Sequence, residues 1–354
     1  MRLRTVLFNV HLCVGLTAAL FVLILGITGS IMAFEPEIEH ASAPRLWYVT
    51  PAGPARSLAG IGAVVARAFP QDTIEEYAVS TRPGLSYQVG LASRVVFVNQ
   101  YTGAILGVNG GFPAWLNAVH QIHTHLLFSN RALGGNIVAG AALALFLMLC
   151  SGLYLWWPLK RISVAWRGTS RRTWFDLHNA AGILAFIFLL VLTLTGLVIG
   201  FERTTTPLFY RVTGSLPSRR PRARLTPAPG AVPIGPDSAL AIARGAIPGA
   251  APFDVEMPGP ADPYVIRSRF PEDRTPGGRS LVFVDQYTGK VLFAEGSRTA
   301  PAGARLVNAN RAIHTGDLFG VPSKVLMSLA SLMAVAQVAT GVMMWVRRKE
   351  RDAG

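Results

Sequence analysis

The sequence predicts a membrane protein in which a bundle of four transmembrane helices carries two duplicated α+β domains. Hydrophobic residues make up 51% of the chain and charged residues 15%, unlike an average soluble domain. Four apolar segments exceed the roughly 18 residues needed to cross a hydrocarbon core. The first half of the sequence also returns in the second half, which indicates a parallel internal repeat.

The predicted spans are residues 7–34, 137–157, 175–201 and 325–346. Lys and Arg gather at the N-terminus, in the loop 158–173 and in the tail 347–354, so these three segments are predicted to be cytoplasmic. The residues concerned are Arg2, Arg4, Lys160, Arg161, Arg167, Arg171, Arg172, Arg347, Arg348, Lys349 and Arg351. The net charge of +14 then reflects topology, and no aromatic-rich basic domain indicates a nucleic-acid partner.

A cleavable signal peptide is the alternative for the N-terminus. The apolar stretch is longer than the 7–15 residues of a signal peptide, and no small-residue cleavage site precedes Glu35. Cys13 and Cys150 both fall inside predicted spans, which excludes a disulfide framework.

The repeat relates the spans and the outer segments. The stretch Phe8 to His11, followed by Gly15, Thr28-Gly29 and Phe34-Glu35, aligns without a gap with Phe175 to His178, Gly182, Thr195-Gly196 and Phe201-Glu202. Outside the spans, residues 97–106 align with 283–292. Each half therefore consists of a span, an outer domain, a histidine segment and a second span.

The outer domains, residues 36–112 and 202–305, are predicted to be small α+β units. Helices are expected at 57–69 and 237–247, and strands at 73–80, 86–91, 95–99, 264–269 and 281–285. Gly103 and Gly289 follow Tyr-Thr, where a hairpin turn needs a backbone tolerant of positive φ. The Pro- and Arg-rich stretch 217–224 is predicted to be a linker.

The paired Val-Asn/Asp-Gln-Tyr-Thr-Gly hairpins resemble PepSY domains, and the segments 313–320 and 340–345 resemble the PepSY-associated transmembrane family. Some members of that family are haem-containing reductases of the bacterial inner (plasma) membrane that act on ferric siderophores in the periplasm. The resemblance therefore implies a multi-pass inner-membrane protein with both termini in the cytoplasm. It also implies haem b, iron and an oxidoreductase activity.

His11 and His178 are equivalent in the repeat, and an ionisable residue inside a span is a functional candidate by default. Gly15 and Gly182 follow them by four residues, one helical turn away on the same face. A missing side chain there would leave room for a flat macrocycle. The pair is predicted to ligate one haem iron, whereas the alternative is that neutral imidazoles hydrogen-bond to neighbours or water.

His123 and His314 lie in the outer segments 113–130 and 306–321 and are also equivalent. They are predicted to ligate a second haem, which gives two haems per chain. His120 is a possible substitute for His123 as the ligand. The counterpart of His120 in the second half is Arg311, whose guanidinium suits a haem propionate. A surface-facing pair, or a zinc, copper or iron site made by His120, His123 and His125, remains the alternative.

The predicted function is transfer of electrons from a cytoplasmic flavoprotein or quinol to a periplasmic acceptor, for which a ferric siderophore is one possibility. No catalytic acid, base or nucleophile is expected. The rival hypothesis is a non-enzymatic PepSY scaffold that binds or inhibits a periplasmic partner. The sequence holds no nucleophile triad, phosphate-binding loop or nucleotide fingerprint, so hydrolase and ATPase functions have no support.

Overall fold

The computed structural model describes residues 3–109, 112–160, 162–166, 169–221, 224–275 and 277–352, without the side chains of 170 and 348–352. Arg2, Arg161 and Arg167, which entered the prediction of orientation, lie outside the described residues. The chain forms two compact units. The helical unit comprises Met1–Glu35, Ala114–Phe209 and Ala309–Gly354, and the sheet unit comprises Pro36–Pro113 and Tyr210–Asn308.

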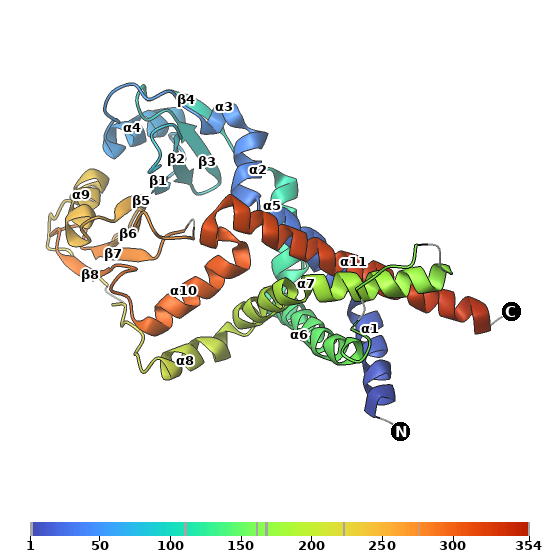
Figure 1. Cartoon of the computed structure of the whole chain (residues 1–354). Helices are drawn as coiled ribbons and strands as arrows, with labels where there is room; N and C mark the ends of the chain where they lie inside the picture. The colour runs from blue at the N-terminus through green and yellow to red at the C-terminus, as the bar shows by residue number, and fades with distance from the viewer. Residues whose placement is uncertain are drawn as a thin grey trace. The chain divides into compact units, whose positions relative to one another are not determined.

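Four helices of the helical unit are long and apolar enough to cross a membrane, among the residues described. They are α1 (Leu3–Met32), α6 (Arg131–Trp156), α7 (Ser170–Gly200) and α11 (Val321–Asp352) (Figure 1). Helices α1 and α7 each pack against both α6 and α11, which makes a four-helix bundle. The chain is therefore a multi-pass membrane protein, as the sequence predicts.

Small residues let these helices approach closely. A Cβ added at Gly26 of α1 would lie 2.8 Å from the Ser331 carbonyl oxygen of α11, and one at Gly200 would lie 2.8 Å from Ala139 Cβ. Ala18 and Ala185 are buried between the helices in the same way. Association in the bundle thus rests on close packing, as is usual where lipid removes the hydrophobic driving force.

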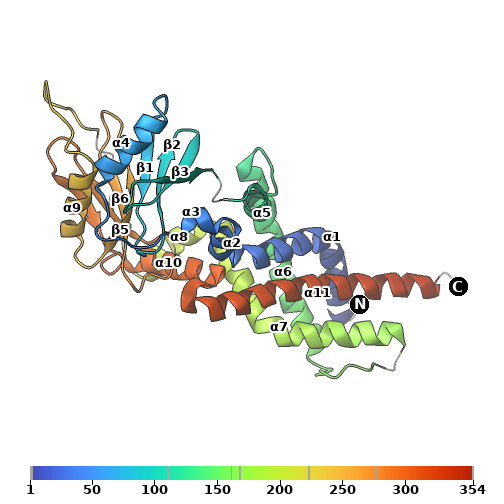
Figure 2. The same cartoon turned by 90° about the horizontal axis from the view of Figure 1, so that it is seen from above.

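Short helices flank the spans. Helix α5 (Ala114–His125) packs against α1 and α6. The others are α2 (Glu35–Ser42), α8 (Glu202–Val212), α10 (Ala302–Thr315) and the 3₁₀ turn η1 (Asp317–Phe319). Helix α3 (Pro44–Trp47) belongs to the sheet unit. Helices α5 and α10 carry the outer histidines (Figure 2).

The sheet unit contains one antiparallel sheet of eight strands in the order β4-β3-β2-β1-β5-β6-β7-β8. The strands are β1 (Ile74–Ala78), β2 (Tyr87–Leu91), β3 (Arg94–Val98), β4 (Ile105–Val108), β5 (Ala251–Glu256), β6 (Tyr264–Arg269), β7 (Ser280–Val284) and β8 (Val291–Glu295). Alternate residues of β6 and β7 are buried, as expected when one face of a sheet is covered.

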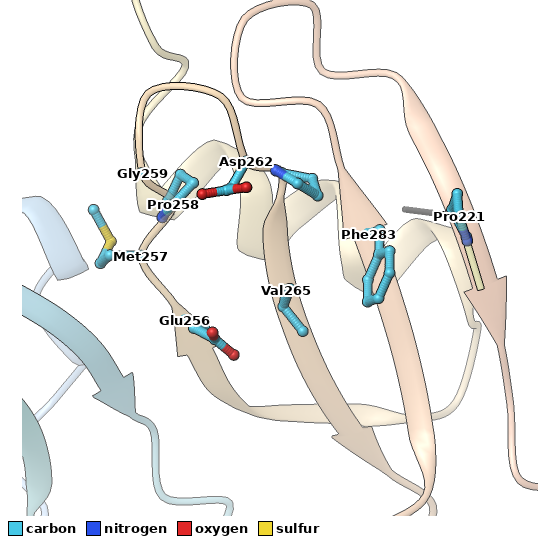
Figure 3. Close-up of a pocket in the computed structure, with 9 residues that line it drawn as sticks. Pro221, Glu256, Met257, Pro258, Gly259, Asp262, Val265 and Phe283 are labelled. Carbon is cyan, nitrogen blue, oxygen red and sulfur yellow. The ribbon is translucent and has the colours of Figure 1, made fainter. Parts of the chain in front are cut away.

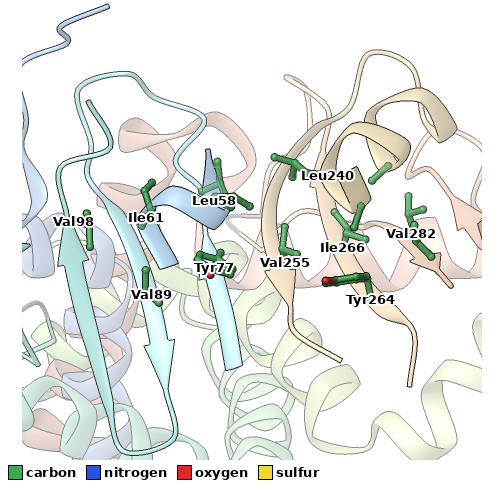
Figure 4. Close-up of a cluster of buried hydrophobic side chains, with 14 of the residues drawn as sticks. Leu58, Ile61, Tyr77, Val89, Val98, Leu240, Val255, Tyr264, Ile266 and Val282 are labelled. Atoms are coloured by element: carbon green, nitrogen blue, oxygen red, sulfur yellow. The ribbon is translucent and has the colours of Figure 1, made fainter. Parts of the chain in front are cut away.

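Helices α4 (Leu58–Ala68) and α9 (Pro236–Ala246) supply the apolar cover for that face. Ile61 of α4 is fully buried together with Val89 of β2, and Ala239 of α9 together with Ile266 of β6. Figure 4 shows Ile61, Val89 and Ile266 among the side chains that helices and strands direct into this core. Burial of such aliphatic side chains contributes about 1.5–3 kcal/mol each.

The Gln-Tyr-Thr-Gly stretches of both halves form the same turn. Gln100 donates from Nε2 to the carbonyl oxygens of Pro83 and Leu85, and Gln286 donates to those of Gly259 and Asp262. Tyr101 and Tyr287 donate their hydroxyls to Pro83 and Pro260. The motif therefore ties each turn to the loop that precedes the neighbouring strand, which is a structural role.

Strands β1 and β5 join the two halves into one sheet, whereas the sequence predicts two separate α+β units. Glu76 lies opposite Glu256, and Tyr77 opposite Val255. On the helix side, the carboxylate of Asp237 accepts hydrogen bonds from the amides of Leu58 and Ala59, at 2.7 and 2.9 Å. Asp237, which belongs to the second half, thereby pairs two backbone amides at the N-terminus of the first half's helix, Leu58–Ala68, that have no partner within that helix.

Candidate functional site

His11 of α1 and His178 of α7 face each other inside the bundle. Their ring centroids are 6.5 Å apart and the ring planes are nearly perpendicular, at 89°. The two residues are 167 positions apart in the chain, so their approach could be predicted only from their equivalence in the repeat.

Each of these imidazoles is held by a hydroxyl on a neighbouring span. The Nδ1 atom of His11 lies 2.8 Å from Ser151 Oγ on α6, and that of His178 lies 2.9 Å from Thr340 Oγ1 on α11. Both hydroxyls donate their own hydrogen to the carbonyl oxygen four residues back, at 2.7 Å. A hydroxyl with its hydrogen committed can only accept, so Nδ1 carries the proton and Nε2 keeps a lone pair.

His123 and His314 are held in the same way. The Nδ1 atom of His123 lies 2.9 Å from Thr28 Oγ1 on α1, and that of His314 lies 3.0 Å from Thr195 Oγ1 on α7. Both threonines donate to the carbonyl oxygen four residues back, at 2.7 Å. All four histidines therefore present Nε2 as the free electron-pair donor, which is the form that binds a metal.

A glycine follows each of the four hydroxyl residues and lies beside the imidazole. A Cβ at Gly29 would come within 2.9 Å of His123 Cε1, and one at Gly196 within 3.2 Å of His314 Cε1. The distances to His11 from Gly152 and to His178 from Gly341 would be 3.3 and 3.6 Å. The Ser/Thr-Gly pair thus provides both an acceptor for the ring and the space in which the ring lies.

The outer imidazoles are neutral at physiological pH. Burial lowers the pKa of His123 to about 3, with a smaller contribution from the neighbouring His314. Burial also lowers the pKa of His314 to about 4. Neutrality keeps Nε2 unprotonated, as a ligand requires.

The sequence predicts an open notch beside Gly15 and Gly182. In the structure, side chains of neighbouring helices lie against both glycines. A Cβ at Gly15 would meet Met148 Cε of α6 at 2.8 Å, and one at Gly182 would meet Gln337 Oε1 of α11 at 3.2 Å. Gln337 also donates to the carbonyl oxygen of His178, at 3.1 Å. The two sides of the inner histidine pair therefore differ, with a thioether on one and an amide on the other.

The remaining outer residues named by the sequence have other partners or none within the site. His120 lies 3.1 Å from Glu35, a hydrogen bond that raises the pKa of the imidazole. His125 places Nδ1 2.8 Å from Thr124 Oγ1. Arg311 is exposed on α10, one turn before His314. No cluster of three or more His, Cys, Asp or Glu side chains suited to a metal ion occurs in the described part of the chain, so the zinc or copper alternative finds no support there.

Sequence reasoning missed Ser151, Gly152 and the role of Thr340-Gly341. The signal was present, because Ser151-Gly152 and Thr340-Gly341 occupy corresponding places in the second span of each half. The Thr28-Gly29 and Thr195-Gly196 pairs entered the sequence analysis only as aligned positions of the repeat. Their hydroxyls bond back to the carbonyl oxygens four residues earlier and also hold the outer histidines.

A comparison with curated proteins finds no match. The family model described as the PepSY-associated TM region matches residues 8–348, which include all four histidines, both histidine segments and the entire sheet unit. The match covers nearly the whole chain, and the chain belongs to this family.

Proposed function

We propose that the protein is a haem b electron-transfer protein of the bacterial inner membrane, in which His11 and His178 would hold one haem and His123 and His314 a second. One observation carries the proposal. Each of the four imidazoles gives its Nδ1 proton to a hydroxyl, which leaves the lone pair of Nε2 for a metal. Ligand histidines are usually oriented by such a second hydrogen bond.

The separation of the inner pair supports this assignment. Two imidazole nitrogens that each bind one metal atom at about 2 Å place their ring centroids about 6 Å apart. The rings of His11 and His178 are 6.5 Å apart.

The two pairs lie at different depths of the membrane. From His11 to Thr28 along α1, and from His178 to Thr195 along α7, the chain advances 17 residues, or about 25 Å of helix. That is most of a hydrocarbon core of about 30 Å. Two electron-accepting centres at these depths would link the two faces of the membrane.

A bound haem supplies a one-electron redox centre, and the chain supplies its ligands and surroundings. The hydroxyls of Ser151, Thr340, Thr28 and Thr195 would fix the ring orientations and make the imidazoles better donors. The apolar spans around the part-buried inner pair would keep bulk water away from it. Arg311 would pair with a propionate of the outer haem.

We also propose the direction of transfer and the origin of the fold. Arg4, Arg172 and Arg347 lie toward the span ends nearer the inner pair, which favours a cytoplasmic or quinol donor there. The acceptor would lie in the periplasm, and a ferric siderophore is the class that the family resemblance implies. The matching turns at Gln100 and Gln286 support an origin of the two sheet halves as duplicated PepSY domains.

The test is a reduced-minus-oxidised visible spectrum of protein purified in detergent from haem-replete cells, with haem quantified per chain. We expect low-spin b-type bands and about two haems per chain. The substitutions His11→Ala and His178→Ala should each remove the same haem, and His123→Ala and His314→Ala the other. His125→Ala is the matched control and should remove neither. A folded but colourless protein would contradict the proposal and leave the PepSY scaffold as the function.

A further inference from the structure

A cavity of about 300 Å³ lies on the sheet unit, on the half formed by β5 to β8. Its lining includes Pro221, Glu256, Met257, Asp262, Val265 and Phe283 (Figure 3). A volume of this size is at the lower end of the range for small-ligand pockets, roughly 300–1,000 Å³. The histidine pairs take no part in this cavity, and the turn at Gln286 holds only the backbone carbonyls of two of its lining residues, Gly259 and Asp262.

The floor of the cavity is one row of the sheet. Val265 of β6 lies opposite Glu256 of β5 and opposite Phe283 of β7. Their neighbours Tyr264 and Ile266 are buried under the helices, so the row faces the other side of the sheet. Phe283 contacts Phe293 of β8, with ring centroids 5.5 Å apart. The floor is therefore apolar and aromatic, with a carboxylate at one end.

The corresponding row of the first half is covered by the chain itself. Phe97 precedes the Asn99 turn as Phe283 precedes the Asp285 turn. The Trp47 ring of α3 contacts Phe97 edge to face, with centroids 5.2 Å apart. Ser86 anchors this cover, because its amide donates to the carbonyl oxygen of Trp47 at 2.8 Å and its hydroxyl to that of Leu46 at 2.6 Å. Phe97 is consequently only 3% exposed.

The second half differs in both cover and charge. In the part of the chain that the structure describes, no aromatic side chain covers Phe283 as Trp47 covers Phe97. Ala78 and Leu85 stand in the first half where Glu256 and Asp262 stand in the second, as judged from their positions relative to Tyr87 and Tyr264. The second half thus has an aromatic floor without such a cover and two carboxylates, Glu256 and Asp262, in the lining of the cavity.

We propose that this cavity binds a small aromatic cation, with the ring in the place that Trp47 takes in the first half. The ring would stack on Phe283 and Val265 against Met257 and Pro221. The cationic group would pair with Asp262 and Glu256. Arg267 lies 3.4 Å from Glu256, so it neutralises part of that charge and leaves Asp262 as the main counter-ion.

The experiment uses the full chain in detergent and two probes with the same ring and opposite charge, tryptamine and indole-3-propionate. Binding is measured by saturation-transfer NMR and isothermal titration calorimetry. We expect tryptamine to bind with a Kd on the order of 1 mM, given its few atoms. Indole-3-propionate should bind about tenfold more weakly.

Three variants locate the site. Val265→Trp fills the cavity and should abolish tryptamine binding, with Val265→Phe as a milder filler if the first variant does not fold. Glu256→Gln combined with Asp262→Asn should remove the preference for the cationic probe. Glu75→Gln combined with Glu272→Gln neutralises two carboxylates outside the cavity and should leave the preference intact. Unchanged tryptamine binding in the filled variants, or no binding to the wild type, would overturn the proposal. The assay does not depend on haem, so its outcome is separate from that of the proposed function.

Discussion

The imidazole of His123 and the hydroxyl of Thr28 are 2.9 Å apart, and the glycine that follows this threonine lies against the same ring. The hydroxyl of Thr28 fixes the tautomer of the His123 imidazole, and the absence of a side chain at Gly29 leaves the space in which the ring lies. The arrangement recurs at His11, His178 and His314. It therefore predicts how each histidine responds when its support is changed.

Replacement of Thr28 or Thr195 by valine keeps the shape and removes the acceptor for Nδ1. The imidazole then loses its fixed tautomer, and affinity for the proposed outer haem should fall about 10- to 100-fold, as for other orienting partners of metal ligands. Haem titration of the purified variants measures this. Thr17→Val is the matched control, because Thr17 lies on α1 and bonds to the Cys13 carbonyl. Equal losses in Thr17→Val and Thr28→Val would contradict the orienting role.

A methyl group at Gly29 should displace the ring of His123, since the new Cβ would lie 2.9 Å from Cε1. We expect Gly29→Ala to lower outer-haem occupancy while the inner haem is retained. Gly140→Ala is the control, because no atom lies within 4 Å of a Cβ at that position of α6. That variant should keep both haems and be slightly more stable, since alanine favours helix over glycine by about 1 kcal/mol.

Separate substitutions of Met148 and Gln337 should change the midpoint potential of the proposed inner haem. A bis-imidazole ferric site carries one more positive charge than the ferrous site, so polar neighbours favour the ferric form. Gln337→Met should raise the midpoint potential by roughly tens of millivolts, and Met148→Gln should lower it. Potentiometric titration followed in the visible spectrum measures both. Shifts of the same sign in the two variants would argue against a polarity effect.

The join between the sheet halves should weaken in alkali. A hydrogen bond with Asp254 and burial, together with the negative charges of Asp254 and Glu256, raise the pKa of Glu76 to about 8 against the opposing effect of Arg267. Because the folded-state pKa lies above the ordinary value of 4.5, the stabilisation is complete below about pH 4.5 and is lost as the pH rises through 8.

Thermal unfolding between pH 6 and 9.5 tests this dependence. Wild type should lose a few degrees of Tm across that window, and Glu76→Gln should be nearly insensitive to pH. Glu75→Gln changes the exposed neighbour on the same strand and should behave as wild type. The idea fails if Glu76→Gln retains the full alkaline loss of stability.

The features that the sequence predicts best are those that depend on local pattern or on the repeat. The four spans follow from composition, and the approach of His11 to His178 follows from their equivalence. The repeated Ser/Thr-Gly pairs could have drawn attention to Ser151 and Thr340, but their contacts with His11 and His178 could not be predicted. They are 140 and 162 residues from these histidines, and the contact depends on the rotation of one span against another. For the same reason Gly15 was expected to face open space and instead meets Met148. Strand β5 was missed because Pro252 interrupts its alternating pattern.

The pairing of β1 with β5 sets an order of events during biosynthesis. Two spans, α6 and α7, lie between these strands in the chain, and both strands must reach the same face of the membrane before they can pair. Until the third span has been inserted, β1 has one unsatisfied edge, which is the kind of edge that recruits other strands. The sheet can therefore be completed only after the third span has crossed the membrane. A ribosome stalled between residues 200 and 250 would leave an aggregation-prone half-sheet, which holdase chaperones should recognise.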